Sequence, residues 1–190
     1  MVSEELGLHH LLSNSNKFNL LHKTPGKFAG FFVIFVTEKF ETKLTMDFYK
    51  ILLHSHKGFA YLELLFATLF LVALLATMFG FSGKVNKFLK KTTLFTMIFF
   101  HIQFTIGAIM LFVSPGVKAA ISSGTLMSDS YSRFQYVEHP FSMLIAAVLM
   151  TIINKKLKTA DTISVAIVAM GVIAVALFGY AFPWARVFGA

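Results

Sequence analysis

The chain has 190 residues, of which 56% are hydrophobic and 14% charged, and its mean hydropathy is +0.72. Soluble domains carry about 25% charged residues, so this composition excludes a disordered chain and argues against a water-soluble domain. The absence of cysteine excludes disulfides, thiolate metal sites and covalently attached c-type haem. The net charge of +8 comes without a nucleic-acid-binding motif, and we attribute it to loops that orient membrane spans.

The first 45 residues are more polar than the rest of the chain. Their one apolar run, Phe28–Val36, is too short to span a bilayer and is interpreted as an interfacial segment or a strand. Met46 stands just before the first long apolar stretch. We therefore divide the chain into residues 1–45, an N-terminal extension or a misassigned start, and residues 46–190, a transmembrane domain.

Four apolar stretches follow, each near the roughly 20 residues that cross a bilayer as a helix. They are Gly58–Phe81, Thr92–Val113, Phe134–Ile153 and Thr162–Trp184. A spanning segment must satisfy its backbone hydrogen bonds internally, so each is predicted to be a helix. Because short connections join antiparallel neighbours, the predicted fold is an all-α membrane protein, an up-down-up-down bundle of four transmembrane helices. The longest connection, residues 114–133, is rich in Gly and Ser.

Lysines gather in two connections at one end of the predicted bundle. Residues 82–91 contain four of them and residues 154–161 contain three. The positive-inside rule places these loops in the cytoplasm and both ends of the bundle in the periplasm. Aromatic residues that fit an interfacial belt lie at the opposite end. They are Tyr49, Tyr131, Tyr136, Tyr180 and Trp184.

Ionisable side chains inside the predicted spans point to function, because they are costly in a bilayer. They are His54, His56, Lys57, Glu63, His101, Glu138 and His139. At 1.5 Å per residue, His56 and His139 lie roughly 10 and 8 Å from the outer ends of their helices. Glu63 and His101 both lie roughly 20 Å in, which gives a second level. His54 is two positions from His56 and is expected to face elsewhere.

Three of the predicted helices carry stripes of small and polar residues at helical spacing. The stripes are His56, Ala60, Glu63 and Ala67; Met97, His101, Thr105 and Ala108; and His139, Ser142, Met143 and Ala146. We expect the three stripes to line one roomy, polar interior of the bundle.

Two imidazoles from facing helices at matched depth in an apolar slot are the ligand set of a b-type haem. His56 and His139 meet the depth condition best, so they are the predicted axial ligands. His101 is the substitute ligand, and Lys57 or Arg133 is expected to pair with the haem propionates. A histidine that ligates a metal usually donates its second ring N–H to a hydrogen-bond acceptor.

Glu63, His101 and Glu138 form a possible polar or proton relay. The alternatives are a structural, inert pair of Glu63 and His101, and an ion path through these two residues that would need a homo-oligomer. Met97 and Met143 are interpreted as packing residues, although a methionine ligand to haem iron or copper stays open.

A family resemblance covers about residues 46–185. It rests on Leu53-His54-Ser55-His56-Lys57-Gly58-Phe59-Ala60-Tyr61-Leu62, His101-Ile102-Gln103 with Gly107, Val113-Ser114-Pro115 and Glu138-His139-Pro140. The sequence resembles small four-helix bacterial inner-membrane proteins labelled cytochrome-b-like. The family pattern has an arginine four residues after the histidine that matches His56. Here Ala60 stands at that place, and Lys57 is the nearby cation.

The leading hypothesis is a haem-b-binding protein of the bacterial inner membrane that transfers electrons, with quinone as a redox partner. The alternative is a non-enzymatic accessory or assembly subunit of a respiratory membrane complex. Small residues along 166–179 favour that alternative because they let helices approach closely. The chain lacks nucleotide-binding loops and an HExxH motif, which argues against a stand-alone soluble enzyme.

Overall fold

The computed structural model describes residues 25–80 and 83–184, with side chains from Lys43 onward. Predictions about residues 1–24 therefore lie outside the described residues. The chain divides into two compact units, Met1–Asp47 and Phe48–Ala190. The second unit holds the predicted bundle and the candidate site.

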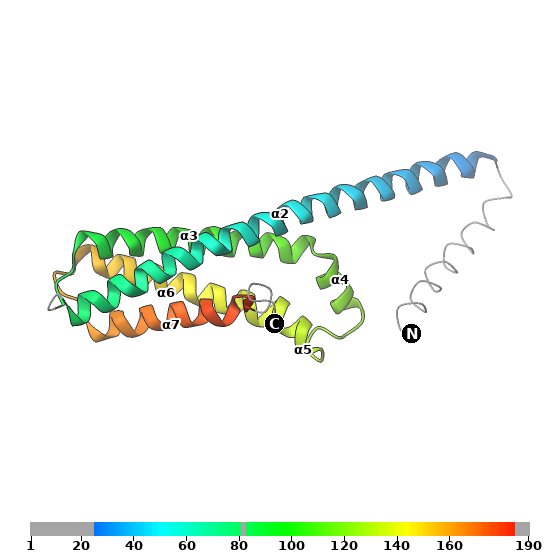
Figure 1. The fold of residues 1–190 in the computed structure, drawn as a ribbon. Helices are drawn as coiled ribbons and strands as arrows, with labels where there is room; N and C mark the ends of the chain where they lie inside the picture. The colour runs from blue at the N-terminus through cyan, green and yellow to red at the C-terminus, as the bar shows by residue number, and fades with distance from the viewer. Residues whose placement is uncertain (1–24, 81–82, 185–190) are drawn as a thin grey trace. The chain divides into compact units, whose positions relative to one another are not determined.

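The described residues form helices and no strands. The helices are α2 (Pro25–Phe79), α3 (Lys87–Val113), α4 (Pro115–Ser122), α5 (Ser130–Arg133), the π-helix η1 (Phe134–Glu138), α6 (His139–Thr159) and α7 (Val165–Ala181). Within the second unit, α3, α6, α7 and the later part of α2 run side by side, and α4 and α5 lie at one end (Figure 1).

Three helical segments are long and apolar enough to cross a membrane. They are Lys43–Phe79, Lys87–Val113 and Ser130–Thr159. The fourth apolar helix, Val165–Ala181, is shorter, with 17 residues. The chain thus fits an all-α membrane protein, as the sequence predicts.

One local alternative is wrong. The strand alternative for Phe28–Val36 fails because α2 is helical from Pro25 onward, and no proline interrupts it before Phe79. The connection 114–133 contains α4, which the Gly and Ser content did not suggest. Its start signals are local: the Ser114 hydroxyl accepts a hydrogen bond of 3.3 Å from the main-chain nitrogen of Val117, and proline occupies the first turn.

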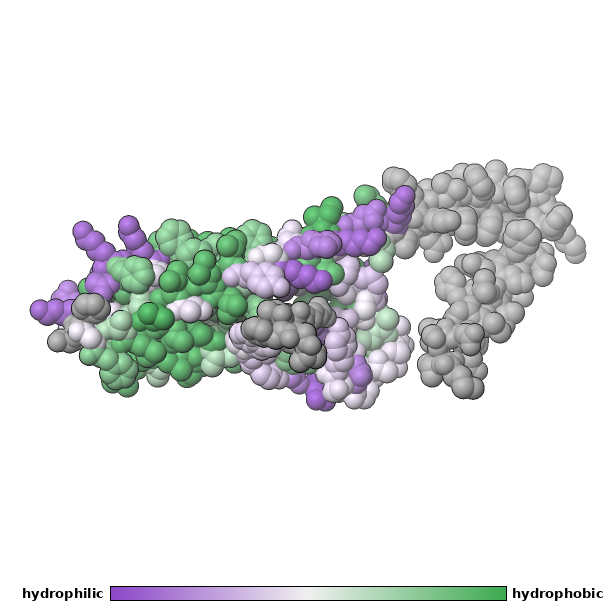
Figure 2. Space-filling model, viewed as in Figure 1, coloured by the Kyte–Doolittle hydropathy of each residue, from purple (hydrophilic) through white to green (hydrophobic). Residues whose placement is uncertain are grey.

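The two lysine-rich connections lie side by side, in agreement with their predicted placement at one end. The main-chain nitrogen of Val85 donates to the oxygen of Asp161 at 2.9 Å, and Lys84 forms an isolated β-bridge with Thr162. Lys90 Nζ donates to the main-chain oxygen of Lys158 at 3.2 Å. Figure 2 shows hydrophilic side chains at this end, next to a broad hydrophobic band.

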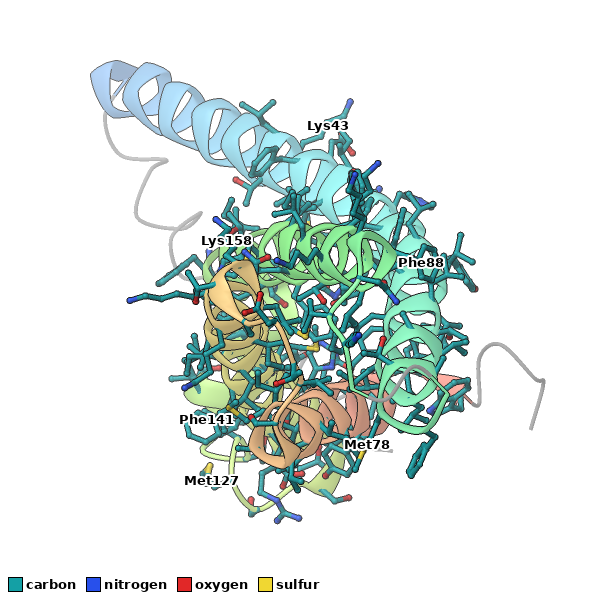
Figure 3. The ribbon with its side chains drawn as sticks, turned by 90° about the vertical axis from the view of Figure 1, so that its left-hand side faces the viewer. Lys43, Met78, Phe88, Met127, Phe141 and Lys158 are labelled. Carbon is teal, nitrogen blue, oxygen red and sulfur yellow. The ribbon has the colours of Figure 1, made fainter. Side chains whose placement is uncertain are left out.

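Side chains from four helices fill the centre of the bundle, as the view along it in Figure 3 shows, with Phe88 and Phe141 on the outside. Helices α2 and α3 meet where the ring of Phe66 stacks on that of Phe99, with centroids 4.8 Å apart. At the same contact, the Thr96 hydroxyl donates to the main-chain oxygen of Phe66 at 2.9 Å. These contacts set the rotation of α3 against α2.

Candidate functional site: a histidine-lined cavity

A cavity of about 340 Å³ lies in the second unit, toward the end that carries α4 and α5. Its wall is mostly apolar and comes from α2, α3, α7 and the run from Tyr131 to Met143. The polar side chains along it include His56, Lys57, Glu63, Gln103, Gln135, Tyr136 and His139. A volume of this size lies within the roughly 300–1,000 Å³ range of small-molecule sites.

His139 reaches the cavity from a distorted stretch of helix. Pro140 has no N–H, so it cannot donate to the carbonyl four residues earlier, and the chain widens into η1 just before it. The N–H of His139 accordingly donates to the main-chain oxygen of Phe134, five residues back. Such π-helical turns occur frequently at functional sites.

The second nitrogen of His139 is tied to the neighbouring helix. Its Nδ1 lies 3.0 Å from the main-chain oxygen of Ala181 at the end of α7. A carbonyl oxygen only accepts, so Nδ1 carries the hydrogen of this bond. In the neutral ring, Nε2 then keeps the lone pair that can ligate a metal.

The structure brings His56 and His139 together. Their ring centroids lie 6.0 Å apart with the planes inclined at 64°, and both residues line the cavity and are half-buried. The first comes from α2 and the second from the start of α6. The meeting of these two rings is the pairing that their matched depths predict.

The ring of His56 rests against a gap in α3. A Cβ at Gly107 would lie 3.3 Å from His56 Cε1 and 3.8 Å from Nδ1. Nδ1 is buried and has no hydrogen-bond partner among the described residues. Gln103 contacts this residue at the backbone instead, where Nε2 donates to the main-chain oxygen of His56 at 2.8 Å.

Glu63 lies two turns further along α2 and is completely buried. Neither carboxyl oxygen has a hydrogen-bond partner in the described part of the chain, and the side chain lines the cavity. The predicted stripe of His56, Ala60, Glu63 and Ala67 therefore faces the interior, with Ala67 1% exposed.

His101 lies elsewhere. It is exposed, its Nδ1 bonds the main-chain oxygen of Met97 at 2.8 Å, and Thr151 Oγ1 lies 3.3 Å from its Nε2. The predicted inward stripe of α3 is wrong for His101 and Thr105, which are exposed, whereas Met97 packs against the core and Ala108 lines the cavity. Other residues of α3 that face inward include Thr93, Thr96, Phe100, Gln103 and Gly107. The structure thus does not bring Glu63 and His101 together.

Glu138 belongs to a separate surface cluster. Its Oε1 accepts a hydrogen bond of 2.9 Å from Arg133, and its Oε2 accepts one of 2.8 Å from the Tyr180 hydroxyl. Arg133 is therefore held by a carboxylate and does not line the cavity. Lys57 does line it, while His54 is exposed and stands apart, as predicted.

Sequence reasoning missed the roles of Gln103, Gly107 and Ala181. The carbonyl of Ala181 is invisible in a sequence, because any residue carries one. Gln103 and Gly107 are four residues apart on one helix face, a spacing that could have marked the stripe that faces the cavity.

Comparison with models of protein families, with curated proteins and with solved structures found no match for this chain.

Proposed function

We propose that the bundle is a haem-b-binding electron-transfer protein with His56 and His139 as axial ligands. The observation that carries this proposal is the approach of two imidazoles from different helices, with centroids 6.0 Å apart, in a mostly apolar cavity. Haem in a helical bundle is held by such facing histidines.

The residues present fit this group. The two ring centroids lie 6.0 Å apart, within reach of one metal that binds an imidazole nitrogen at about 2.0–2.1 Å. The Nδ1–H of His139 is already bonded to Ala181, which leaves Nε2 for the metal. Ala60, Gly107 and Ala108 are small residues in the wall, so space remains beside the rings.

Bound haem would supply one-electron redox chemistry in a site of low polarity. His56 and His139 would hold it. The cavity wall, with Phe104, Phe134 and Phe178, would limit the access of water. Lys57, the cation in the wall, would pair with acidic groups of the ligand. Quinone in the lipid phase is the proposed redox partner.

The proposal includes four spans in a bacterial inner membrane. Helix α7 would be the fourth: its 17 residues extend about 26 Å, close to the roughly 30 Å of a hydrocarbon core. The lysine-rich loops would face the cytoplasm, and the cavity would lie in the outer half of the membrane. Of the small residues of α7 that favour the alternative, an accessory subunit, Gly171 and Ala174 are buried within the chain's own bundle, while Ala166, Ala169 and Ala176 are exposed.

The test is a visible absorption spectrum of the protein purified after expression with ample haem, before and after reduction. We expect a Soret band and reduced α and β bands. The double variant His56→Ala with His139→Ala should lose them. His54→Ala, two residues away on an exposed face, is the matched control and should keep them. Absence of a Soret band in the unmodified protein would contradict the proposal.

A further inference from the structure

The two facing histidines differ in what their second ring nitrogen touches. The Nδ1 of His139 bonds the main-chain oxygen of Ala181 at 3.0 Å. The Nδ1 of His56 is buried and finds no acceptor among the described residues. One ring is therefore oriented by a hydrogen bond, and the other is not.

The edge of the His56 ring that carries Nδ1 faces α3. The nearest position on α3 is Gly107, which has no side chain, and the added Cβ would fall 3.3 Å from the ring. Main-chain oxygens of α3 do accept side-chain hydrogen bonds, as that of Met97 does from His101, but none of them is bonded to the His56 ring. The amide of Gln103 uses its Nε2 to donate to the main-chain oxygen of His56, and its Oε1 is buried without a partner among the described residues and is not bonded to the ring.

This difference changes the strength of a metal ligand. An acceptor for the second N–H fixes the ring and makes the ligating nitrogen more basic, and its loss typically costs about 10–100-fold in metal affinity. His139 has this support and also sits in η1–α6, a backbone held by Ala181 and by the bond to Phe134. His56 has only its packing against α3.

Building on the proposed haem function, we propose that His139 is the permanent ligand and His56 the displaceable one. The His56 side of the cavity would then admit a small neutral diatomic ligand, such as carbon monoxide or nitric oxide. Ala60, one turn from His56 and also in the cavity wall, leaves room on that side. The exchange replaces one donor lone pair by another and transfers no electron or proton.

The first measurement titrates the reduced, haem-loaded protein with carbon monoxide and follows its absorption spectrum. We expect saturable binding that displaces His56. His56→Ala should bind carbon monoxide at least about 10-fold more tightly, because the competing ligand is gone. His139→Ala should instead lose haem affinity by at least the roughly 10–100-fold that loss of a ligand's hydrogen-bond partner costs, as measured by transfer of haem to apomyoglobin.

A second pair of variants tests the same point without removing a ligand. Gly107→Ala places a methyl group against the His56 ring, so carbon monoxide affinity should rise while haem stays bound through His139. Gly58→Ala is the matched control, because nothing lies within 4 Å of its added Cβ. It should leave both affinities unchanged.

The outcomes separate the two proposals. A protein without any haem spectrum contradicts the proposed function. A protein that binds haem, but whose unmodified form and Gly107→Ala variant both resist saturating carbon monoxide, overturns the inference about His56. Equal losses of haem affinity in His56→Ala and His139→Ala also overturn it, because the two ligands would then be equivalent.

Discussion

The side-chain amide of Gln103 in α3 donates a hydrogen bond of 2.8 Å to the main-chain oxygen of His56 in α2. This bond holds two helices together beside the cavity, at a residue that is 3% exposed. The acceptor carbonyl also belongs to the α2 helix, so it keeps its intrahelical partner if the amide is removed. The bond therefore positions α2 more than it stabilises the fold.

Gln103→Leu should change the free energy of unfolding by less than about 1 kcal/mol, since such interhelical bonds average about 0.6 kcal/mol in membranes. The measurement is unfolding of the purified protein in mixed detergent micelles. Phe100→Ala is the comparison on the same helix, because Phe100 is completely buried and packs on Phe178. It should cost about 3–5 kcal/mol. Losses of equal size would show that Gln103 is a main source of stability.

The carboxyl group of Glu63 should lower the stability of the protein. It is completely buried, and neither oxygen has a partner among the described residues. A buried polar group without a hydrogen bond costs about 1–3 kcal/mol, so Glu63→Met should raise the free energy of unfolding by an amount in that range.

Thr77→Val is the control for Glu63→Met. Thr77 is equally buried on α2, but its hydroxyl donates to the main-chain oxygen of Ala73 at 2.8 Å. Its replacement should therefore give no gain. A loss of stability in Glu63→Met would mean that the carboxyl group has a partner in solution.

Gly171 lies where α7 packs against α2. An added Cβ would lie 2.6 Å from Leu74 Cδ2 and 3.1 Å from Phe70 Cζ, and both of these side chains are completely buried. Overpacking of this kind costs about 1–3 kcal/mol, so Gly171→Ala should lower the melting temperature in detergent. Gly179→Ala on the same helix meets nothing within 4 Å and should not lower it. Equal melting temperatures for the two variants would contradict the packing described for α7.

Asp129 makes the start of α5 sensitive to acid. Hydrogen bonds from the main-chain N–H and the hydroxyl of Ser132 hold the pKa of the Asp129 carboxyl below its ordinary value. The bond from the main-chain nitrogen measures 2.8 Å. A group with a lowered pKa in the folded state stabilises that state above its unfolded pKa, and the contribution is lost as the pH falls through the folded pKa.

Asp129→Ala should therefore lower the melting temperature at pH 7, and its difference from the unmodified protein should shrink as the pH falls below about 4. Thermal unfolding in detergent over a pH series measures this. Asp129→Asn keeps a capping oxygen at every pH and should stay close to the unmodified protein near neutral pH. A difference between Asp129→Ala and the unmodified protein that is constant with pH would show that the carboxylate does not act through this cap.

The amino-acid sequence was sufficient to predict most of the architecture. Long apolar stretches with few charges can satisfy their backbone only as helices, and short connections make neighbours antiparallel. Clustered lysines in 82–91 and 154–161 correctly indicated that these two connections lie at one end. The depth of His56 and His139 follows from the rise of a helix, and their rings do meet.

Rotation about a helix axis was harder to predict. Helix α3 carries apolar residues on nearly all of its faces. Hydropathy therefore does not distinguish the face toward lipid from the face toward the bundle. The inner side of α3 has Phe100 and Gln103, whereas His101 is exposed. The contacts of α3 with its neighbours, such as Thr96 with Phe66 in α2 and Phe100 with Phe178 in α7, determine that rotation.

Residue types, their spacing along each helix and the membrane-like pattern of the chain are properties of the sequence, and they led to the pair His56 and His139. The difference between these two histidines is a tertiary property. It depends on a main-chain carbonyl of Ala181 that reaches one ring and on a missing side chain at Gly107 beside the other. Such contacts join segments far apart in the chain, so they arise only once the helices have packed.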